Sequence, residues 1–464
     1  MAVEKRCGRS MSETKQASPA PAHLTATDAA AALASGSLTS EQLIRSCLDR
    51  IAARDSDVQA FAHFDAERVL ADAKASDAAR ARGDAIGPLA GIPVAIKDII
   101  DTADYPTENG TPVFAGRQPE QDASVVAQLK AAGAIIFGKT VTTELAFFGP
   151  GKTKNPHDPS RTPGGSSSGS AAAVADFQVP LALGTQTAGS VIRPASYCGV
   201  IGFKPTFGAV SRVGVLAQSE PLDTIGGYAR SVDDVALMMH AISGFDPADA
   251  DMTKDSRFTN QPLSSPSRPP RIAFVKSPAW PNADAAAKLA IEAFAGSFGD
   301  RAEIVEVPLP ADFDGSLRLQ QIVQFSDIAR NYGPIADANP NLVSAKLKEI
   351  IAEGRTFSKS DYTAARADRD PLYECLLPTL NAYDAILTPA APGVALEGLG
   401  ATGSPMFNAL WTYLGMPCIS LPLLNLDGLP LGVQLTAARH RDRDLLVIAK
   451  WMLQAAPSAS VPNS

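Results

Sequence analysis

Cysteine and histidine are scarce in this sequence of 464 residues, which contains five of each. The cysteines are odd in number and widely separated, so they suit neither a disulfide framework nor a zinc-binding spacing. The histidines show no HExxH or HxH pattern, which metal-binding helices and strands commonly carry. The sequence therefore predicts no catalytic metal site.

Long apolar runs and blocks of positive charge are also missing. No uninterrupted apolar stretch approaches the roughly 18 residues of a membrane span. The formal net charge is −8, and without a Lys/Arg cluster this disfavours a nucleic-acid surface. The N-terminal stretch is polar and lacks the apolar centre of a signal peptide. We therefore expect a cytoplasmic protein in which residues 1–22 form a disordered tail. The second methionine, Met11, leaves the start of translation open.

Stretches with helical periodicity alternate with short apolar runs from about residue 24 onward. A capping box, Thr39 to Gln42, begins one helix, and an Ala-rich helix is expected at 65–82. Apolar runs at 92–98 and 135–139 are typical of buried strands. This alternation predicts an α/β fold with a large, mixed, mostly parallel central sheet and helices on both faces. The Asp/Pro-rich and Ser/Pro-rich stretch at 245–271 predicts a surface linker.

Two loops rich in glycine and hydroxyl side chains, residues 163–170 and 184–190, are the most informative part of the chain. A predicted helix at 171–175 and a predicted strand at 179–183 connect them, so both loops should return to one place. Glycine lets the backbone approach a ligand closely. Hydroxyls beside unobstructed N–H groups are what an activated nucleophile and an oxyanion hole require.

Other interpretations of the first loop are weaker. Residues 165–169 match G-x-S-x-G, which would make Ser167 the nucleophile of an α/β-hydrolase elbow. That elbow needs a strand directly before it, whereas residues 155–163 read as a Pro-rich loop. A phosphate-binding loop would need Gly-Lys-Ser/Thr next, which is absent. A flexible linker is disfavoured by the apolar helix that follows.

Lys97 comes directly after the apolar run 92–96. It could be a lysine at a strand end whose ammonium reaches water. Alternatively it is buried, neutral and able to act as a general base, which requires the site to lower its pKa considerably from the free value of about 10.4.

Taken together, these segments resemble the amidase signature family of serine amidases. The matching segments are 91–98, 131–140, 162–175, 184–195 and 202–206, with closing segments at 384–389, 405–408 and 429–434. The resemblance covers about 25–245 and 380–455. It implies a single amidase domain over 23–464, with a variable, substrate-shaping segment at about 250–375, and it implies no metal or organic cofactor. A homodimer is possible by the same resemblance.

The resemblance also assigns roles. Ser190 would be the nucleophile, Ser166 a bridging serine preceded by a cis peptide bond, and Lys97 the base. The expected oxyanion hole consists of four successive backbone N–H groups, those of Thr187, Ala188, Gly189 and Ser190. The chain departs from the commonest pattern at Gln186, where many relatives have aspartate, and at Ser168, where glycine is frequent.

Three further residues are expected to contact substrate: Arg193, Thr185 and Gln324. Arg193 follows Ser190 by three residues, which could place both on one side of a helical turn. It could clamp a substrate carboxylate, as in malonamidase-type members of the family, or form a structural ion pair, for example with Asp98 or Glu144.

The resemblance predicts hydrolysis of a small carboxamide to a carboxylate and ammonia or amine, through an acyl-enzyme on Ser190. One alternative is the glutaminase component of a tRNA-dependent amidotransferase, which would need partner subunits. The other is a catalytically inactive relative that only binds. The identity of the amide cannot be read from the sequence.

Overall fold

The computed structural model describes residues 20–457 except 85–86 and 255–257. Within that part of the chain, eleven strands form one sheet in the order β1-β3-β2-β4-β6-β5-β10-β11-β9-β7-β8. The strands are β1 Phe61–Phe64, β2 Pro93–Lys97, β3 Ile135–Thr140, β4 Leu181–Gln186, β5 Ile201–Lys204, β6 Thr224–Ala229, β7 Arg271–Phe274, β8 Glu303–Glu306, β9 Ala385–Pro389, β10 Cys418–Leu426 and β11 Leu429–Thr436.

The sheet is mixed as expected, but the expected excess of parallel pairing is wrong. Six neighbouring pairs are antiparallel and four are parallel. Parallel pairing surrounds β2, whose neighbours β3 and β4 are each reached through a crossover. Further along the sheet, β10 and β11 form a hairpin whose two turn residues, Asp427 and Gly428, both have positive φ. Such a tight turn joins antiparallel strands only.

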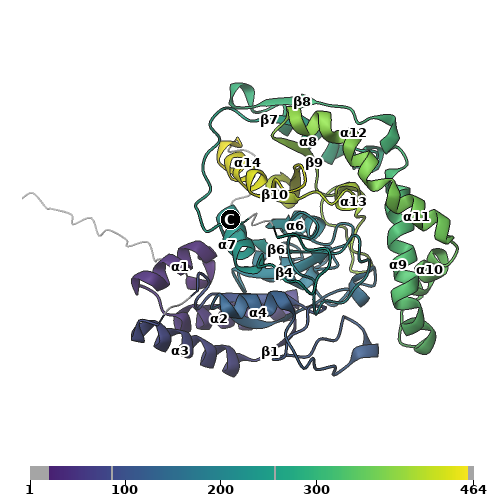
Figure 1. Cartoon of the computed structure of the whole chain (residues 1–464). Helices are drawn as coiled ribbons and strands as arrows, with labels where there is room; N and C mark the ends of the chain where they lie inside the picture. The colour runs from purple at the N-terminus through teal and green to yellow at the C-terminus, as the bar shows by residue number, and fades with distance from the viewer. Residues whose placement is uncertain (1–19, 85–86, 255–257, 458–464) are drawn as a thin grey trace, which may run out of the picture.

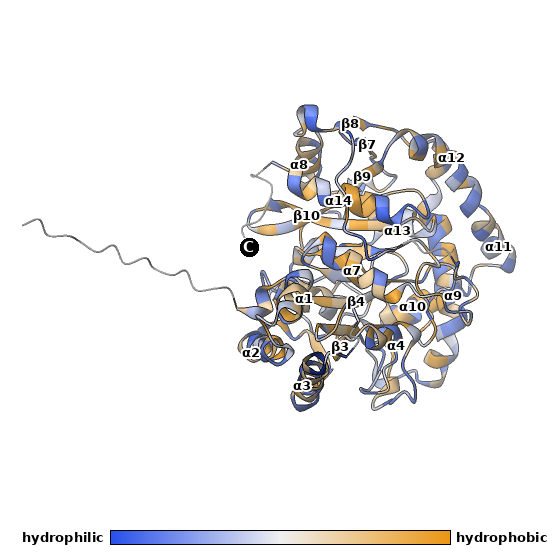
Figure 2. Ribbon diagram, turned by 60° about the vertical axis from the view of Figure 1, so that its left-hand side comes forward, coloured by the Kyte–Doolittle hydropathy of each residue, from blue (hydrophilic) through white to orange (hydrophobic). Residues whose placement is uncertain are grey.

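Helices cover the sheet, and Figure 1 shows α9, α10 and α11 gathered at one side of the molecule. The helices are α1 Ala26–Ser35, α2 Ser40–Val58, α3 Ala66–Arg82, α4 Ser124–Ala131, α5 Ser168–Ala175, α6 Ile192–Cys198, α7 Val232–Ile242, α8 Ala285–Ala295, α9 Ser316–Ala338, α10 Ala345–Gly354, α11 Lys359–Ala367, α12 Arg369–Ala382, α13 Met406–Tyr413 and α14 Asp442–Ala455. Figure 2 shows hydrophilic stretches on the peripheral helices α3, α11 and α12, as expected for helices with one face in water.

Local signals placed several helix ends correctly. The capping box at the start of α2 is present, with Thr39 accepting from the Gln42 N–H and the Gln42 side chain accepting from the Thr39 N–H. The helices α11 and α12 follow one another directly and meet at Asp368. Pro371 lies in the first turn of α12, where proline is tolerated because no intrahelical N–H is needed there.

Packing begins before residue 23, so the expected boundary of the N-terminal tail is too late. Residues 1–19 lie outside the described residues. Residues Pro21–His23 form a 3₁₀ helix, and Ala22 is buried. The Arg230 guanidinium donates to the Ala22 and Leu24 carbonyls, which holds this segment on the body of the protein.

The linker expected at 245–271 has no helix or strand in its described part before β7 begins, yet it is packed rather than loose. Met252, Phe258 and Leu263 are buried. Asp249 forms an ion pair with Arg212 at 2.8 Å. The segment therefore forms a wall of the protein body. The β7 and β8 strands that follow it join the same sheet through β9.

Candidate active site

The predicted base and the predicted bridging serine meet where two parallel strands end. β2 and β4 are parallel neighbours, so their carboxyl ends lie at the same edge of the sheet. Lys97 is the last residue of β2, and its Nζ lies 2.6 Å from Ser166 Oγ and 2.8 Å from Thr185 Oγ1 of β4. Lys97 is fully buried and Ser166 is 2% exposed. Lys97 is thus not a lysine whose ammonium reaches water.

Burial makes the Lys97 ammonium easier to deprotonate. Desolvation lowers its pKa well below the ordinary value, and the Asp223 carboxylate raises it only in part. No carboxylate in the described chain forms an ion pair with Lys97. The next residue, the buried Asp98, pairs with Lys139 at 3.3 Å. A neutral amine can accept a proton, so the environment suits a general base.

The first Gly/Ser loop leads into α5, and the Gly165–Ser166 peptide bond is cis, as expected. The Arg193 side chain is hydrogen-bonded to this peptide unit. Its Nη2 donates to the Gly165 carbonyl at 2.7 Å and its Nε to the Thr402 carbonyl at 2.8 Å. The Ser167 hydroxyl is hydrogen-bonded to the backbone of Thr185. It donates to the Thr185 carbonyl and accepts from the Thr185 N–H, each at 3.2 Å. Ser167 is therefore structural, and no strand precedes it directly.

The second loop presents free N–H groups beside the predicted nucleophile. In the described chain, the N–H groups of Ala188, Gly189 and Ser190 have no hydrogen-bond acceptor, although each of the three carbonyls has a donor. Thr412 Oγ1 donates to Ala188, the Arg193 N–H to Gly189 and the Tyr228 hydroxyl to Ser190. Ser190 is partly exposed, whereas residues 181–189 and 191–198 are buried.

Gly189 is needed because α13 approaches this loop closely. A Cβ at this position would come within 2.4 Å of Asn408 Oδ1 and 2.9 Å of Pro405 Cβ. A larger residue would push the loop, and with it the free N–H groups, away from α13.

Gln186 fixes the far end of the loop. Its Oε1 accepts from the N–H groups of Val191 and Ile192 at 2.9 and 3.0 Å, and its Nε2 donates to Thr412 Oγ1 at 2.9 Å. The neutral amide thus satisfies both donors at the start of α6 and ties the loop to α13. The residue that departs from the commonest family pattern has a positioning role here.

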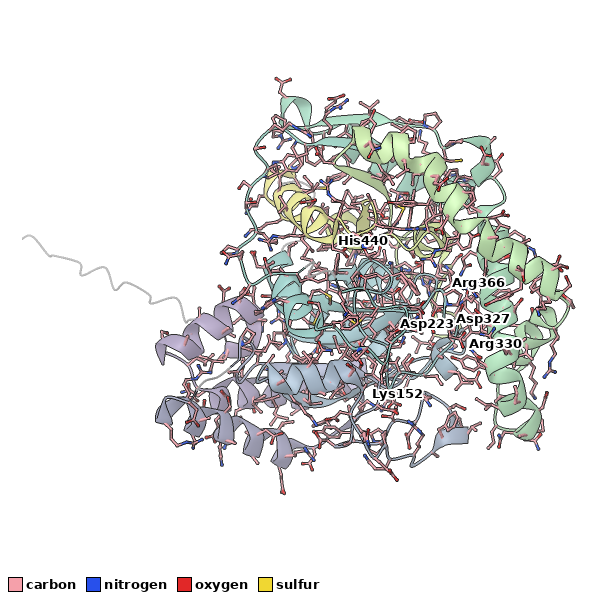
Figure 3. The ribbon with its side chains drawn as sticks, in the orientation of Figure 1. Lys152, Asp223, Asp327, Arg330, Arg366 and His440 are labelled. Carbon is pink, nitrogen blue, oxygen red and sulfur yellow. The ribbon has the colours of Figure 1, made fainter. Side chains whose placement is uncertain are left out.

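Asp223, which the sequence alone did not single out, faces the site from the other side. It accepts from the Thr187 hydroxyl at 2.6 Å and from the Gln218 and Ser219 N–H groups. Desolvation raises its pKa to about 6. Its loop faces α9, since Ser219 bonds Asp327 and Glu220 pairs with Arg330; Figure 3 labels both partners beside Asp223.

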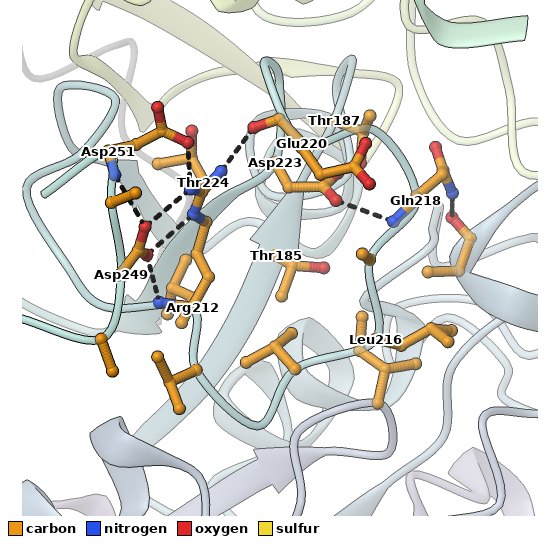
Figure 4. A pocket seen from close by; sticks show the side chains of 18 residues that line it. Thr185, Thr187, Arg212, Leu216, Gln218, Glu220, Asp223, Thr224, Asp249 and Asp251 are labelled. Carbon is orange, nitrogen blue, oxygen red and sulfur yellow. Dashed lines mark hydrogen bonds and ion pairs between the residues drawn. The ribbon is translucent and has the colours of Figure 1, made fainter. Parts of the chain in front are cut away.

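A pocket of about 280 Å³ opens beside this loop. Figure 4 shows Thr185 in its wall, with Arg212, Asp249 and Asp251 on one side and Gln218 and Asp223 on the other. The full lining is Ile99, Ala146, Thr185, Thr187, Arg212, Val213, Val215, Leu216, Ala217, Gln218, Glu220, Asp223, Thr224, Ile225, Ala248, Asp249, Ala250 and Asp251.

Of the three residues expected to contact substrate, only Thr185 lies in this pocket. Gln324 is buried on α9 and lies behind the wall, where it donates to Gln218 Oε1 at 2.7 Å. Arg193 is also outside the lining. The ion pairs considered as an alternative for Arg193 are not formed: Asp98 pairs with Lys139, and Glu144 accepts from the Ser344 N–H. Burial lowers the Arg193 pKa to about 10.

The described part of the chain contains neither a metal-binding cluster nor a membrane-spanning helix. No group of three or more His, Cys, Asp or Glu side chains could hold a metal ion there. No helix in these ranges combines the length and apolar character required to cross a membrane.

Comparisons with known proteins agree with this geometry. The Amidase family model matches residues 42–446. In Chloroflexus aggregans, the A-type subunit of glutamyl-tRNA(Gln) amidotransferase is 34% identical, over 91% of this chain and 94% of its own length. The corresponding subunit from Anaeromyxobacter sp. is 35% identical over 91% and 94%.

Solved structures match over nearly the whole chain as well. The peptide amidase of Stenotrophomonas maltophilia superposes with a TM-score of 0.81 at 27% identity, covering 95% of this chain and 99% of its own. The A-type subunit of glutamyl-tRNA(Gln) amidotransferase from Thermotoga maritima gives 0.78 at 28% identity, with 96% and 99% covered. The family model, the fold and the two Gly/Ser loops agree: this chain belongs to the amidase signature family.

Proposed function

We propose that the protein hydrolyses a carboxamide through an acyl-enzyme on Ser190, with Ser166 and Lys97 as a proton relay. The observation that carries this proposal is the buried contact between Lys97 Nζ and Ser166 Oγ at 2.6 Å, beside a loop with three unused N–H groups. A neutral base, a bridging hydroxyl and oxyanion donors are the groups that acyl transfer needs.

In the first half of the reaction, Ser190 Oγ attacks the amide carbon. Its proton passes to Ser166 Oγ as the proton of Ser166 passes to Lys97 Nζ. The N–H groups of the loop from Thr187 to Ser190 stabilise the negative charge that develops on the carbonyl oxygen. The relay then returns a proton to the amide nitrogen, the C–N bond breaks, and ammonia or an amine leaves an acyl group on Ser190.

In the second half, water replaces the amine. The neutral Lys97 takes a proton from it through Ser166, and the water oxygen attacks the acyl carbon. As the tetrahedral intermediate collapses and the C–O bond to Ser190 breaks, Lys97 returns this proton through Ser166 to Ser190 Oγ. The acid product leaves and loses its proton to water, which gives the carboxylate. Each side chain ends in its starting protonation state, so no cofactor is consumed.

A clamp by Arg193 on a substrate carboxylate is not the interpretation that the contacts favour. Its guanidinium donates to two backbone carbonyls, and it does not line the pocket. We infer that Arg193 holds Gly165, and through it Ser166, in position.

A second candidate function is the glutaminase component of a tRNA-dependent amidotransferase. The relatives matched over nine-tenths of this chain at 34% and 35% identity carry an amidotransferase name, which favours this candidate over a generic amidase. The chemistry on Ser190 would be the same, with glutamine as the amide and the ammonia passed to a partner protein. An inactive binding relative is disfavoured by the intact arrangement of Lys97 and Ser166.

The test is ammonia release from a panel of primary amides that includes glutamine, with wild type and Ser190→Ala side by side. We expect wild type to release ammonia and Ser190→Ala to release none above background. Release from glutamine alone, increased by the purified partner subunits of a relative, would favour the second candidate. No release from any amide, with an unreactive Ser190, would refute both enzymatic functions.

A further inference from the structure

The pocket beside Thr185 and Thr187 has no part in the proton relay. We propose that it holds an uncharged, branched or single-ring apolar group of the amide substrate and rejects a carboxylate there. This inference rests on the proposed function, because it names the substrate class of the same site.

The position of the pocket ties it to the reacting atoms. Thr185 lines it, and the hydroxyl of Thr185 accepts from Lys97 Nζ at 2.8 Å. Thr187 also lines it and belongs to the loop that ends at Ser190. A group in the pocket therefore lies against the strand and the loop that carry these residues.

Half of the residues that line the pocket are aliphatic. The apolar side chains come from four separate segments, with Ile99 after β2, Ala146 before the first Gly/Ser loop, Val215 and Leu216 in the loop before β6, and Ile225 within β6. The volume of about 280 Å³ is at the small end of ligand pockets, which commonly span roughly 300–1,000 Å³. Each methylene buried there should strengthen binding about fourfold.

The charges around the pocket are unfavourable for an anion. Four carboxylates line it, those of Glu220, Asp223, Asp249 and Asp251, against one guanidinium, Arg212. Asp249 and Asp251 pair with Arg212 and Glu220 pairs with Arg330, so Asp223 is the lining carboxylate without an ion pair in the described chain. Like charges brought together without a partner weaken binding strongly.

Arg212 is not free to bind a ligand. It donates to Asp249 through both Nε and Nη2, to Asp251 through Nη2 and to the Glu220 carbonyl through Nη1. One face of its guanidinium lies over the Phe207 ring, 5.0 Å from the centroid. The single cation in the wall is thus already neutralised by its own neighbours.

Other arginines are close in the fold but belong to different cavities. Arg366 and Arg369 line two adjoining cavities that share only Glu220 and Asp251 with this pocket. An amide whose acyl group fits beside Thr185 therefore meets aliphatic carbon and carboxylates, and does not meet a free guanidinium.

Two ligands of equal size separate the possibilities. 4-Methylpentanamide and the succinamate anion have the same number of heavy atoms and differ in having an isopropyl group or a carboxylate at the far end. Binding of each to Ser190→Ala, which cannot turn them over, is measured by NMR titration. We expect 4-methylpentanamide to bind at least about tenfold more tightly than succinamate.

The same titration is repeated with Leu216→Lys and with its matched control, Leu216→Met, each combined with Ser190→Ala. Lysine adds an ammonium to the pocket and should reverse the preference, while methionine should keep it. Equal binding of the two ligands, tighter binding of succinamate, binding of neither, or no response of the ratio to Leu216→Lys would each overturn the inference.

Hydrolysis by wild type is scored separately, so that the two claims can fail independently. Selective binding of 4-methylpentanamide without ammonia release from it or any other amide would leave the pocket assignment intact and refute the proposed function. Release of ammonia from both amides at equal kcat/KM would support the function and overturn the pocket assignment.

Discussion

Lys97 Nζ lies 2.6 Å from Ser166 Oγ, and both side chains are removed from solvent. No carboxylate in the described chain pairs with Lys97, whereas Lys139 on the neighbouring strand, equally buried, pairs with Asp98. Two lysines in nearly the same surroundings thus have different partners, and this difference is why we propose a catalytic role for Lys97 and a structural role for Lys139.

The two lysines should respond differently to the same substitution. Lys97→Met should lower kcat/KM by at least about 10²–10⁴, the usual contribution of a general base. It should not lower the free energy of unfolding at pH 7, because wild type must release the Lys97 proton on folding. Lys139→Met leaves Asp98 buried and unpaired, which should cost about 3–5 kcal/mol. Denaturant unfolding and amide hydrolysis check both expectations. Loss of stability in Lys97→Met matching that in Lys139→Met would contradict the assignment.

The lowered pKa of Lys97 predicts a dependence of stability on pH. Above its folded pKa the native state has released this proton, while the unfolded chain holds it up to about pH 10.4. Stability should therefore rise with pH in that interval, by up to about 1.4 kcal/mol per pH unit. The free energy of unfolding of wild type relative to Lys97→Met, measured from pH 7 to 10, should show this slope. A flat difference would mean that Lys97 keeps its proton in the native state.

Asp223 should set the acidic limb of the pH–rate profile. Its negative charge raises the pKa of Lys97, so Asp223→Asn should lower that pKa and move the limb of kcat/KM to lower pH. Asp251→Asn, in the same pocket wall, has no such effect on Lys97 and should leave the limb in place. A shift of the limb to higher pH in Asp223→Asn, or equal shifts in both variants, would rule out this electrostatic role.

Gln186→Ala should disturb the loop from Thr187 to Ser190, which holds the proposed oxyanion donors. It leaves the N–H groups of Val191 and Ile192 without their acceptor and should cost about 2 kcal/mol of stability. A displacement of the loop by about 1 Å would reduce kcat roughly 10²-fold. Thermal unfolding and steady-state kinetics measure the two effects. Retention of full activity would show that the loop keeps its position without this side chain.

Arg193→Ala should lower kcat/KM by the same factor on all substrates. It leaves the Gly165 and Thr402 carbonyls without their guanidinium donor, which should cost at least about 2 kcal/mol. Because Ser166 follows Gly165, kcat/KM should fall equally for neutral and carboxylated amides. A selective loss on carboxylated amides would restore the clamp interpretation.

Much of this fold could be predicted from local signals, and the parts that could not have physical reasons. The start of α2 follows from a capping box, and β2 and β3 from apolar runs. β6 escaped detection because it contains Gly226 and Gly227, which disfavour strands when taken alone. Glycine is needed at 226 because a Cβ there would lie 2.3 Å from the Phe203 carbonyl oxygen, a contact made by a neighbouring strand.

The candidate site likewise contains residues that could be predicted from the sequence and residues that could not. The sequence located Lys97, Ser166 and Thr185, which the structure brings within hydrogen-bonding distance, because each lies in a distinctive local segment. It did not locate Asp223 or the part played by Gln218, because their importance arises only where the loop 218–223 folds against Thr187 and α9. Gln324 lies close to the pocket, but it contacts Gln218 and does not line the pocket itself. Long-range packing decides which of these two glutamines faces the pocket.

The central claim is that Ser190 forms the covalent intermediate, and covalent labelling tests it most directly. The protein is treated with an organophosphonate probe, and the modified residue is located by peptide mass spectrometry. The account predicts one adduct per chain, on Ser190, absent in Ser190→Ala and formed far more slowly in Lys97→Met. An adduct on Ser166 or Ser167, or equal labelling of wild type and Lys97→Met, would contradict it.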